Sequence, residues 1–356
     1  MRCRMAVLAV LAGAGLFAVP VFQVQAVGPA GYASGATAIS GTGVVVGNYV
    51  MPDGTSRGFL YQDGAVTTLE LPAGASQTWA NAVSDGGRVG GMADTGQGLI
   101  WDNFGGVSAV AGAYVMGMNG AGDASGMTAE GEAFVRLGGV VSTLGQPAGG
   151  SWSVANAVNQ YGVAAGTAMT ATGSFRAFSG GTVLGTLGGG NSYGNAIGAS
   201  GTVVGSAQVG SGAMRAVRWD GGVATNLGTL GGTNSYGYGV SSSGQVVGIS
   251  DLTGGGGTAA FLWDAGVMYD LNGLLGPGTA WELLAAYGMN DRGQIVGTGR
   301  LDGVEQAVLL TPEVAMQTTR AMSIAPPPVP ETGVPEPAAL WLVGISVLLL
   351  FALRSR

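Results

Sequence analysis

The chain has 356 residues, and its composition excludes most familiar enzyme chemistries. It contains no histidine, 70 glycines, 13 prolines and a single cysteine, Cys3, and all 13 basic residues are arginines. These counts exclude a Cys/His zinc site, a histidine-based triad, a Schiff-base lysine and a disulfide within the chain. The formal charge of -7 argues against nucleic acid as a partner. Carboxylate chemistry and calcium binding through oxygen ligands survive these exclusions, and we expect no cofactor.

The N-terminus has the pattern of an export signal. Arg2 and Arg4 precede an apolar run from Met5 to Phe22, and Val24-Gln25-Ala26 supplies small residues at alternate positions. A basic start, an apolar stretch and such a site are typical of a secretory signal peptide. We predict a signal peptide over residues 1–26, cut by signal peptidase near Ala26, with an uncleaved membrane anchor as the alternative.

The body of the chain is a repeat of about 42 residues. Residues 185–194 and 228–237 differ at one position, and a turn of the form Ser/Asn/Gly-x-x-Gly-x-apolar-x-Gly occurs seven times. We call the last glycine of each copy an anchor glycine; they are Gly47, Gly91, Gly126, Gly166, Gly205, Gly248 and Gly297. A fixed period of this length indicates a repeat architecture rather than a single mixed fold.

Each unit carries four short runs of strand-forming residues. In the sixth unit they are 238–241, 245–249, 260–263 and 267–271, separated by glycine-rich turns. Four strands per unit predict an all-β fold, a β-propeller of about seven four-stranded blades over residues 27–311. The closing strand is predicted from residues 27–33 or 314–324; without either, the ring is open or has six blades.

Ala133-Phe134, Ala177-Phe178 and Ala260-Phe261-Leu262-Trp263 recur at one place in the repeat. With the Leu-Gly-Gly-x-Asn-Ser-Tyr-Gly segments, they make residues 36–311 resemble the HAF repeats of exported bacterial proteins. The histidine of that family is replaced by Glu132, Arg176 and Ala259. The resemblance implies an exported protein of this fold class and no particular activity.

Aromatic side chains recur just before the tight turns and form a candidate ligand face. We place them in the segments that join successive blades, where they would stack on sugar rings. The alternative is that they pack between blades, as we expect for Trp101, Trp219 and Trp263 of the third strands. The candidates are Trp79, Tyr114, Trp152, Tyr193, Tyr236 and Trp281.

The acidic residues supply no recognisable catalytic motif. Asp102, Asp220 and Asp264 each follow a third-strand tryptophan and are interpreted as turn residues. A pair of carboxylates elsewhere in the chain would be enough for a glycoside hydrolase. Calcium binding is not indicated, because no Asp-x-Asp string of a calcium loop occurs. We predict no catalytic residue and no metal ligand.

The C-terminus has the order of a sorting signal. After a proline-rich linker, 312–333, come Val334-Pro335-Glu336-Pro337, an uncharged stretch over 338–353 that predicts a short membrane helix, and Arg354 and Arg356. Residues 334–356 resemble the PEP-CTERM signal of Gram-negative bacteria. The resemblance implies that an exosortase-type protease recognises residues 334–337 and removes the helix, so that membrane attachment is transient.

Three functions remain open from the sequence. The first is a non-enzymatic cell-surface or extracellular-matrix protein that binds exopolysaccharide. The second is a carboxylate-dependent polysaccharide hydrolase or lyase on the same scaffold. The third is a periplasmic protein-interaction scaffold that keeps its helix in the inner membrane.

Overall fold

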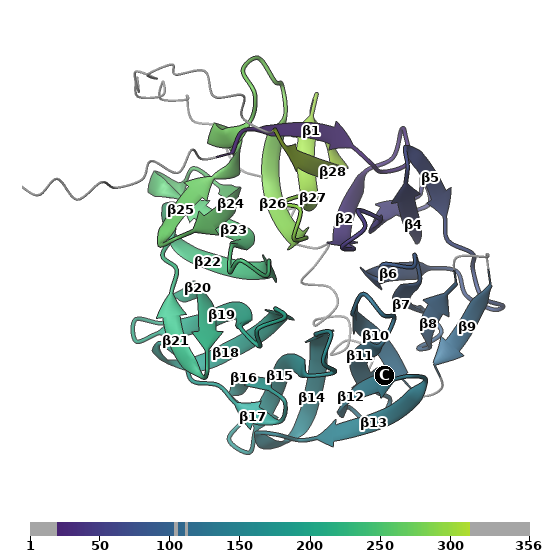
Figure 1. The fold of residues 1–356 in the computed structure, drawn as a ribbon, viewed down its shortest axis with the longest axis vertical. Helices are drawn as coiled ribbons and strands as arrows, with labels where there is room; N and C mark the ends of the chain where they lie inside the picture. Colours follow the sequence, from purple (N-terminus) through teal and green to yellow (C-terminus); the bar gives the residue numbers. More distant parts are fainter. Residues whose placement is uncertain (1–19, 103–105, 111–112, 314–356) are drawn as a thin grey trace, which may run out of the picture.

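A computed structural model describes residues 20–102, 106–110 and 113–313. These residues form seven four-stranded antiparallel sheets arranged as blades around a central axis (Figure 1). The predicted all-β propeller of seven four-stranded blades is therefore confirmed. No helix in these ranges is long and apolar enough to cross a membrane. The linker, the 334–337 motif and the 338–353 helix lie outside the described residues.

Each of the first six blades uses four consecutive strands, with the first strand nearest the axis (Figure 1). Blades 1 to 3 comprise β2 (Ser34–Ile39), β3 (Val45–Val50), β4 (Ser56–Gln62), β5 (Ala65–Thr68), β6 (Thr78–Val83), β7 (Val89–Ala93), β8 (Gly98–Trp101), β9 (Val107–Val110), β10 (Ala113–Met118), β11 (Ala124–Thr128), β12 (Ala133–Leu137) and β13 (Val140–Gly145). Blades 4 to 6 comprise β14 (Gly149–Val158), β15 (Ala164–Thr170), β16 (Phe175–Ser179), β17 (Thr182–Val183), β18 (Gly188–Ile197), β19 (Val203–Val209), β20 (Met214–Asp220), β21 (Val223–Asn226), β22 (Gly231–Val240), β23 (Val246–Leu252), β24 (Thr258–Asp264) and β25 (Val267–Asp270).

The seventh blade draws its outer strand from the N-terminal side of the chain. Its order is β1 (Phe22–Ala26), β28 (Val304–Pro312), β27 (Ile295–Leu301) and β26 (Glu282–Met289), so β1 closes the ring. The prediction of residues 27–33 as the closing strand was wrong, because the pairing begins earlier; residues 314–324 lie outside the described residues. The propeller therefore begins at β1, inside the range predicted as signal peptide. Two short 3-10 helices, η1 (Thr253–Gly255) and η2 (Leu271–Leu274), complete the described elements.

Every anchor glycine lies in a second strand at the point where the first strand of the same blade bulges. The pairing register skips one inner-strand residue immediately after the partner of each anchor glycine. A Cβ on any of the seven would overlap a carbonyl oxygen of that inner strand; at Gly248 the oxygen belongs to Tyr236. The repeat requires glycine here because the backbones approach too closely for a side chain.

The phenylalanines of the third strands occupy the same place in the blade. Phe59, Phe134, Phe178 and Phe261 are paired with anchor glycines and are fully buried. Their rings fill the space that the glycines leave, and a Cβ on Gly248 would lie 2.7 Å from Phe261 Cε1. The glycine and the aromatic ring are therefore two halves of one packing unit.

In five blades the residue before the core side chain of the third strand is glycine or alanine, and the next blade packs against it. Its backbone N–H donates to a buried hydroxyl of the neighbouring inner strand, as in Ala177 to Ser192 Oγ at 3.0 Å. The same bond joins Gly58 to Thr78, Ala133 to Ser153, Ala216 to Ser235 and Ala307 to Ser34. A larger side chain would separate two blades that are linked by a buried hydrogen bond.

Gly248→Ala is expected to destabilise the fold by about 2–3 kcal/mol, because the new methyl group overlaps Tyr236 O and the Phe261 ring. Gly185→Ala is the matched control, since a Cβ at Gly185 meets no atom within 4 Å. It is expected to change the free energy of unfolding by less than about 0.5 kcal/mol. Urea unfolding of both variants measures the difference, and equal losses would contradict the packing account.

Candidate functional site

The bulges of the innermost strands place one side chain per blade where it can reach the next blade. We call these the bulge residues; they are Thr37, Asn81, Met116, Asn156, Asn195, Tyr238 and Tyr287. Four of them donate a 2.8 Å hydrogen bond to a backbone carbonyl of the following blade: Thr37 to Ala80, Asn81 to Val115, Asn156 to Gly194 and Asn195 to Gly237. The polar side chains nearest the axis are thus used to join blades.

Two tyrosines replace the amides in the last two blades. The rings of the bulge residues Tyr238 and Tyr287 lie 5.4 Å apart between centroids, at an interplanar angle of 59°. Burial raises the pKa of both phenols well above the usual value, and the charge of Glu305 adds to the effect on Tyr287. Both phenols therefore stay protonated at neutral pH, and a ring contact replaces the hydrogen bond at this joint.

In three blades the asparagine that begins the tight turn has a second linking role. The Oδ1 atoms of the buried residues Asn119, Asn159 and Asn290 each accept two N–H groups of their own turn. Their amide nitrogens donate to a carbonyl of the next turn; the bond from Asn290 to Ser40 O is 3.0 Å and joins blade 7 to blade 1. One amide thus shapes its own turn and holds a neighbouring blade.

Arginine stands two residues before the core side chain of the third strand in three blades. Arg57, Arg176 and Arg215 each donate through Nη1 to a backbone carbonyl at the start of the next inner strand, at Ser76, Gly190 and Thr233. The contacts run between neighbouring blades in every case. This position therefore serves a structural contact in the described propeller, which agrees with its tolerance of Glu132 and Ala259 elsewhere in the chain.

The predicted ligand-face aromatics are distributed over six blades rather than gathered in one place. Trp79, Tyr114, Tyr193 and Tyr236 lie within the innermost strands, so their prediction as blade-joining residues was wrong. Trp152 is 7% exposed, and Tyr114 packs against the same cluster. Trp281 precedes β26 and packs against the core of the last blade. The inner strands are longer than predicted, which draws these side chains into the sheets.

Some of the predicted ligand-face aromatics stack against aromatic rings of the same or the neighbouring blade. Phe175 lies 6.0 Å from Trp152 and 5.6 Å from Tyr193 between ring centroids, so three rings from blades 4 and 5 form a continuous contact. Burial raises the pKa of the Tyr193 and Tyr236 phenols. These contacts match the packing alternative, and the third-strand residues Trp101 and Trp219 are also core.

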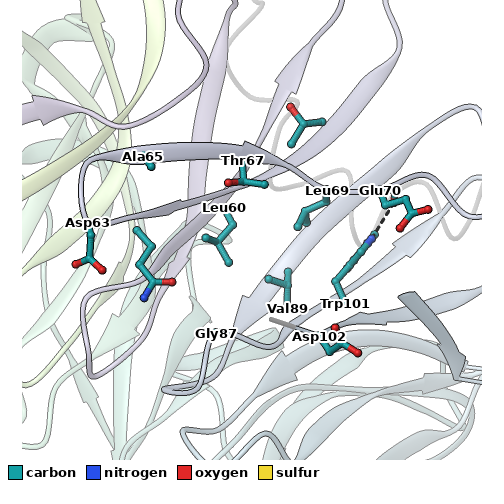
Figure 2. A pocket seen from close by; sticks show the side chains of 12 residues that line it. Leu60, Asp63, Ala65, Thr67, Leu69, Glu70, Gly87, Val89, Trp101 and Asp102 are labelled. Atoms are coloured by element: carbon teal, nitrogen blue, oxygen red, sulfur yellow. Dashed lines mark hydrogen bonds between the residues drawn. The ribbon is translucent and has the colours of Figure 1, made fainter. Parts of the chain in front are cut away.

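A hollow of about 500 Å³ lies between the outer strands of blade 1 and the neighbouring edge of blade 2 (Figure 2). Its volume is in the range of small-ligand sites. Asp63 lies at one end, Glu70 and Asp102 at the other, and Thr67 between them. Trp101, which is buried, donates from Nε1 to Glu70 O at 2.8 Å and fixes one wall. The remaining lining residues are Leu60, Gln62, Ala65, Thr68, Leu69, Gly87 and Val89.

The hollow could not have been predicted from local sequence. It combines a hairpin of one blade with strand ends of the next, and these segments lie up to 42 positions apart in the chain. The Asp-Gly pair at Asp63, where φ is 50°, signalled only a turn. The bulge amides, in contrast, carried a signal that we missed, because Asn-Ala-Val or Asn-Ala-Ile recurs at Asn81, Asn156 and Asn195.

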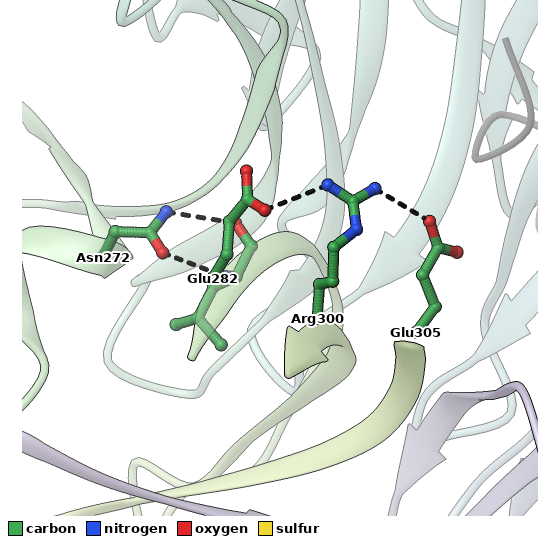
Figure 3. A network of polar contacts seen from close by, with 5 residues as sticks. Asn272, Glu282, Arg300 and Glu305 are labelled. Carbon is green, nitrogen blue, oxygen red and sulfur yellow. Dashed lines mark hydrogen bonds and ion pairs between the residues drawn. The ribbon is translucent and has the colours of Figure 1, made fainter. Parts of the chain in front are cut away.

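In blade 7 two carboxylates lie on either side of one arginine (Figure 3). Arg300 pairs with Glu282 at 3.0 Å and with Glu305 at 3.1 Å. Burial lowers the pKa of Arg300, but the bonds and charges of both partners outweigh it and raise the pKa above the usual value. Beside this network, Asn272 donates to Leu283 O and accepts from Leu283 N, which fixes the start of β26.

The aspartates that follow the third-strand tryptophans act in turns and strand edges. Asp102 accepts the N–H of Gly106 at 2.9 Å, and Asp264 accepts from Gln245 at 3.0 Å. Asp220 accepts from Arg218 and from Thr202, both at 2.7 Å. Within the described ranges, no group of three or more acidic or cysteine side chains is placed to hold a metal ion.

Comparison with known proteins adds only distant similarity. No family model matches the chain, and no curated protein matches it. Among solved structures, a catalytically inactive virginiamycin B lyase from Staphylococcus aureus with quinupristin is 14% identical, with a TM-score of 0.47, over 82% of this chain and 99% of that chain. YCF48 bound to D1 peptide is 12% identical, with a TM-score of 0.42, over 82% and 97%. A putative TolB from Agrobacterium tumefaciens is 15% identical, with a TM-score of 0.32, over 75% and 90%.

Acid titration of Asp220 provides a test of the edge contacts. Burial raises its pKa, but hydrogen bonds from Arg218 and Thr202 and the Arg218 charge outweigh burial and lower it. A carboxyl group whose pKa is lower in the folded state stabilises the fold at pH values above its unfolded pKa of about 3.9. This stabilisation is lost as the pH falls through the pKa of the folded state. Asp220→Asn is expected to flatten the loss of melting temperature between about pH 5 and 3.

The control is Asp302→Asn, at an exposed turn position with φ of 51°, which asparagine also adopts. At pH 7 the Asp220→Asn cost is expected to stay below about 1 kcal/mol, because the pair is partly exposed to solvent. Melting curves across this pH range, parallel for wild type and Asp220→Asn, would show that the contact does not stabilise the fold.

Proposed function

We propose that this protein is an exported, non-enzymatic β-propeller that works at the cell surface or in the extracellular matrix as a binding component. The observation that carries the proposal is the use of the repeated polar side chains. Bulge amides, turn amides and third-strand arginines all bond to the next blade. Repeated residues that hold the ring together favour a rigid scaffold, whose ligand contacts lie on residues that are not repeated.

The charge state of the acids favours binding over hydrolysis. A carboxylate-dependent hydrolase needs one carboxyl group that stays protonated near neutral pH. The carboxyl pKa values that shift clearly, at Asp53, Asp94 and Asp220, all move down, through hydrogen bonds that outweigh burial at Asp94 and Asp220. Glu282 and Glu305 share the Arg300 guanidinium. The lowered pKa values of Asp53, Asp94 and Asp220 favour the anion over a proton donor at these three positions.

We place ligand binding in the hollow between blades 1 and 2. Its hydroxyl, amide and carboxylate side chains can hydrogen-bond to sugar hydroxyl groups, and its size suits a short glycan segment. Its acidic ends and the formal charge of -7 disfavour a strongly anionic polymer. The ligand we propose is therefore a charge-neutral exopolysaccharide, held along the hairpin of β4 and β5.

The proposed destination rests on the two terminal segments. Residues 334–337, the uncharged stretch and the final arginines resemble a PEP-CTERM signal, and the N-terminus resembles a signal peptide. Processing at both ends would release the propeller at the cell surface. Retention of the C-terminal stretch would instead favour a scaffold anchored in the inner membrane and facing the periplasm.

Thr67→Arg tests the hollow, because a long side chain at this exposed position fills the space between its ends. Thr225→Arg is the matched control; Thr225 has the same register in blade 5, opposite Arg218, as Thr67 has opposite Leu60 in blade 1. Titration calorimetry with the host's neutral exopolysaccharide is expected to show at least tenfold weaker binding for Thr67→Arg alone. Unchanged binding by both variants would move the site elsewhere.

Pro335→Ala with Pro337→Ala tests sorting, since the resemblance assigns recognition to this tripeptide. Fractionation of the native host and intact mass are expected to show a surface form without the C-terminal stretch for the parent chain. The double variant is expected to keep that stretch and stay with the membrane. The control is the double variant Pro327→Ala with Pro328→Ala in the linker. If the parent protein itself retains its C-terminal residues, exosortase processing is rejected.

A further inference from the structure

We propose that the strand that closes the propeller belongs to the mature protein, so that the export signal is cut upstream of Phe22, after Ala18, rather than after Ala26. The carrying observation is the pairing of β1 with β28 over five residues, from Phe22 opposite Pro312 to Ala26 opposite Val308. A cut after Ala26 would remove the whole strand and leave the edge of β28 unpaired.

The contacts of β1 show that it is an integral strand of the propeller. Phe22 is 2% exposed and packs in the same core cluster as Leu283 and Leu310. Its carbonyl accepts the N–H of Gly276, and the carbonyl of Val21 accepts the N–H of Glu313 at 2.7 Å. Gln25 donates to the Tyr61 hydroxyl at 3.0 Å, so β1 also joins blade 7 to blade 1.

The residue that would become the new N-terminus is one of the most buried in the fold. Val27 is 1% exposed, and its backbone N–H donates to Ala307 O at 2.9 Å. A cut after Ala26 would convert this N–H into a charged ammonium group inside an apolar cluster that also contains Phe59 and Val296. Burying a charge without a charged partner is costly, so a chain that begins at Val27 conflicts with its own core.

The repeat shows independently that this segment is part of the propeller. The bond from Val27 to Ala307 has counterparts at the ends of other outer strands: Leu69 to Gly58, Leu184 to Ala177 and Leu227 to Ala216. Pro-Ala-Gly follows the outer strand three times, ending at Gly31, Gly74 and Gly149, with φ of 82°, 83° and 75°. Residues 22–31 therefore occupy the place of a fourth strand and its blade-joining turn.

The sequence upstream can supply the cut. The run from Met5 to Phe17 has 13 residues, within the range of a signal-peptide apolar region. Ala18 supplies the small residue directly before the cut, and Leu16 stands two positions earlier. A mature chain that begins at Val19 would keep every contact described above.

N-terminal sequencing and intact mass of the protein exported by its native host test this assignment. Two bulky substitutions separate the sites: Ala18→Leu is expected to abolish the cut after residue 18, whereas Ala26→Leu, at an exposed position of β1, is expected to leave the start at Val19 unchanged. A parent chain that begins at Val27, with cleavage lost in Ala26→Leu, overturns the proposal.

A second measurement tests the closing strand itself. Chains 19–356 and 27–356, produced without export, are expected to differ in melting temperature by on the order of 10 °C, because the shorter chain loses Phe22 and one edge pairing. Equal melting temperatures would show that β1 is dispensable. Glycan binding enters neither readout, so this proposal and the proposed function fail separately.

Discussion

The close approach of two backbones at each anchor glycine is the contact on which the rest of this propeller depends. Without a side chain at Gly205 or Gly248, the carbonyl of the inner strand fits against the second strand, and the inner strand bulges beside it. The bulge turns one residue toward the next blade, and in blade 6 the Phe261 ring of the third strand also packs against Gly248. One missing Cβ thus sets the sheet geometry, the core packing and the joint between blades.

The joints between blades explain why a chain so poor in charge still repeats its few polar residues. Asn156 and Asn195 bond to inner-strand carbonyl groups of the next blade, and Asn119 and Asn290 bond to a carbonyl of the next tight turn. Each bond gives an amide group inside the ring a partner and links two blades. Polar chemistry in the repeat is therefore mainly structural, and the features that differ between blades are left for recognition.

The hollow beside Thr67 is such a difference. Equivalent hairpins exist in other blades, and Leu69, Trp101 and Asp102 have counterparts there, but Glu70 at one end of this hollow has no acidic counterpart. The buried Trp101 keeps its ring in the core and presents the hollow with a fixed wall. A recognition site built on outer strands leaves the axis undisturbed, so the ring can keep its stability while this surface varies in sequence.

The sequence by itself determined the number of blades, the strands within a blade and the anchor glycines, because these depend on residues close together in the chain. It placed Tyr193 and Tyr236 outside the strands, since strand length is set by pairing with a neighbour. Only the tertiary structure decided the closing strand, the joint from Asn290 to Ser40 and the hollow. Each of these features joins segments that are distant in sequence: Gly87 and Thr67 both line the hollow, and Gln23 donates to Glu313 at the closing strand. The distances between such segments are fixed only when the ring closes.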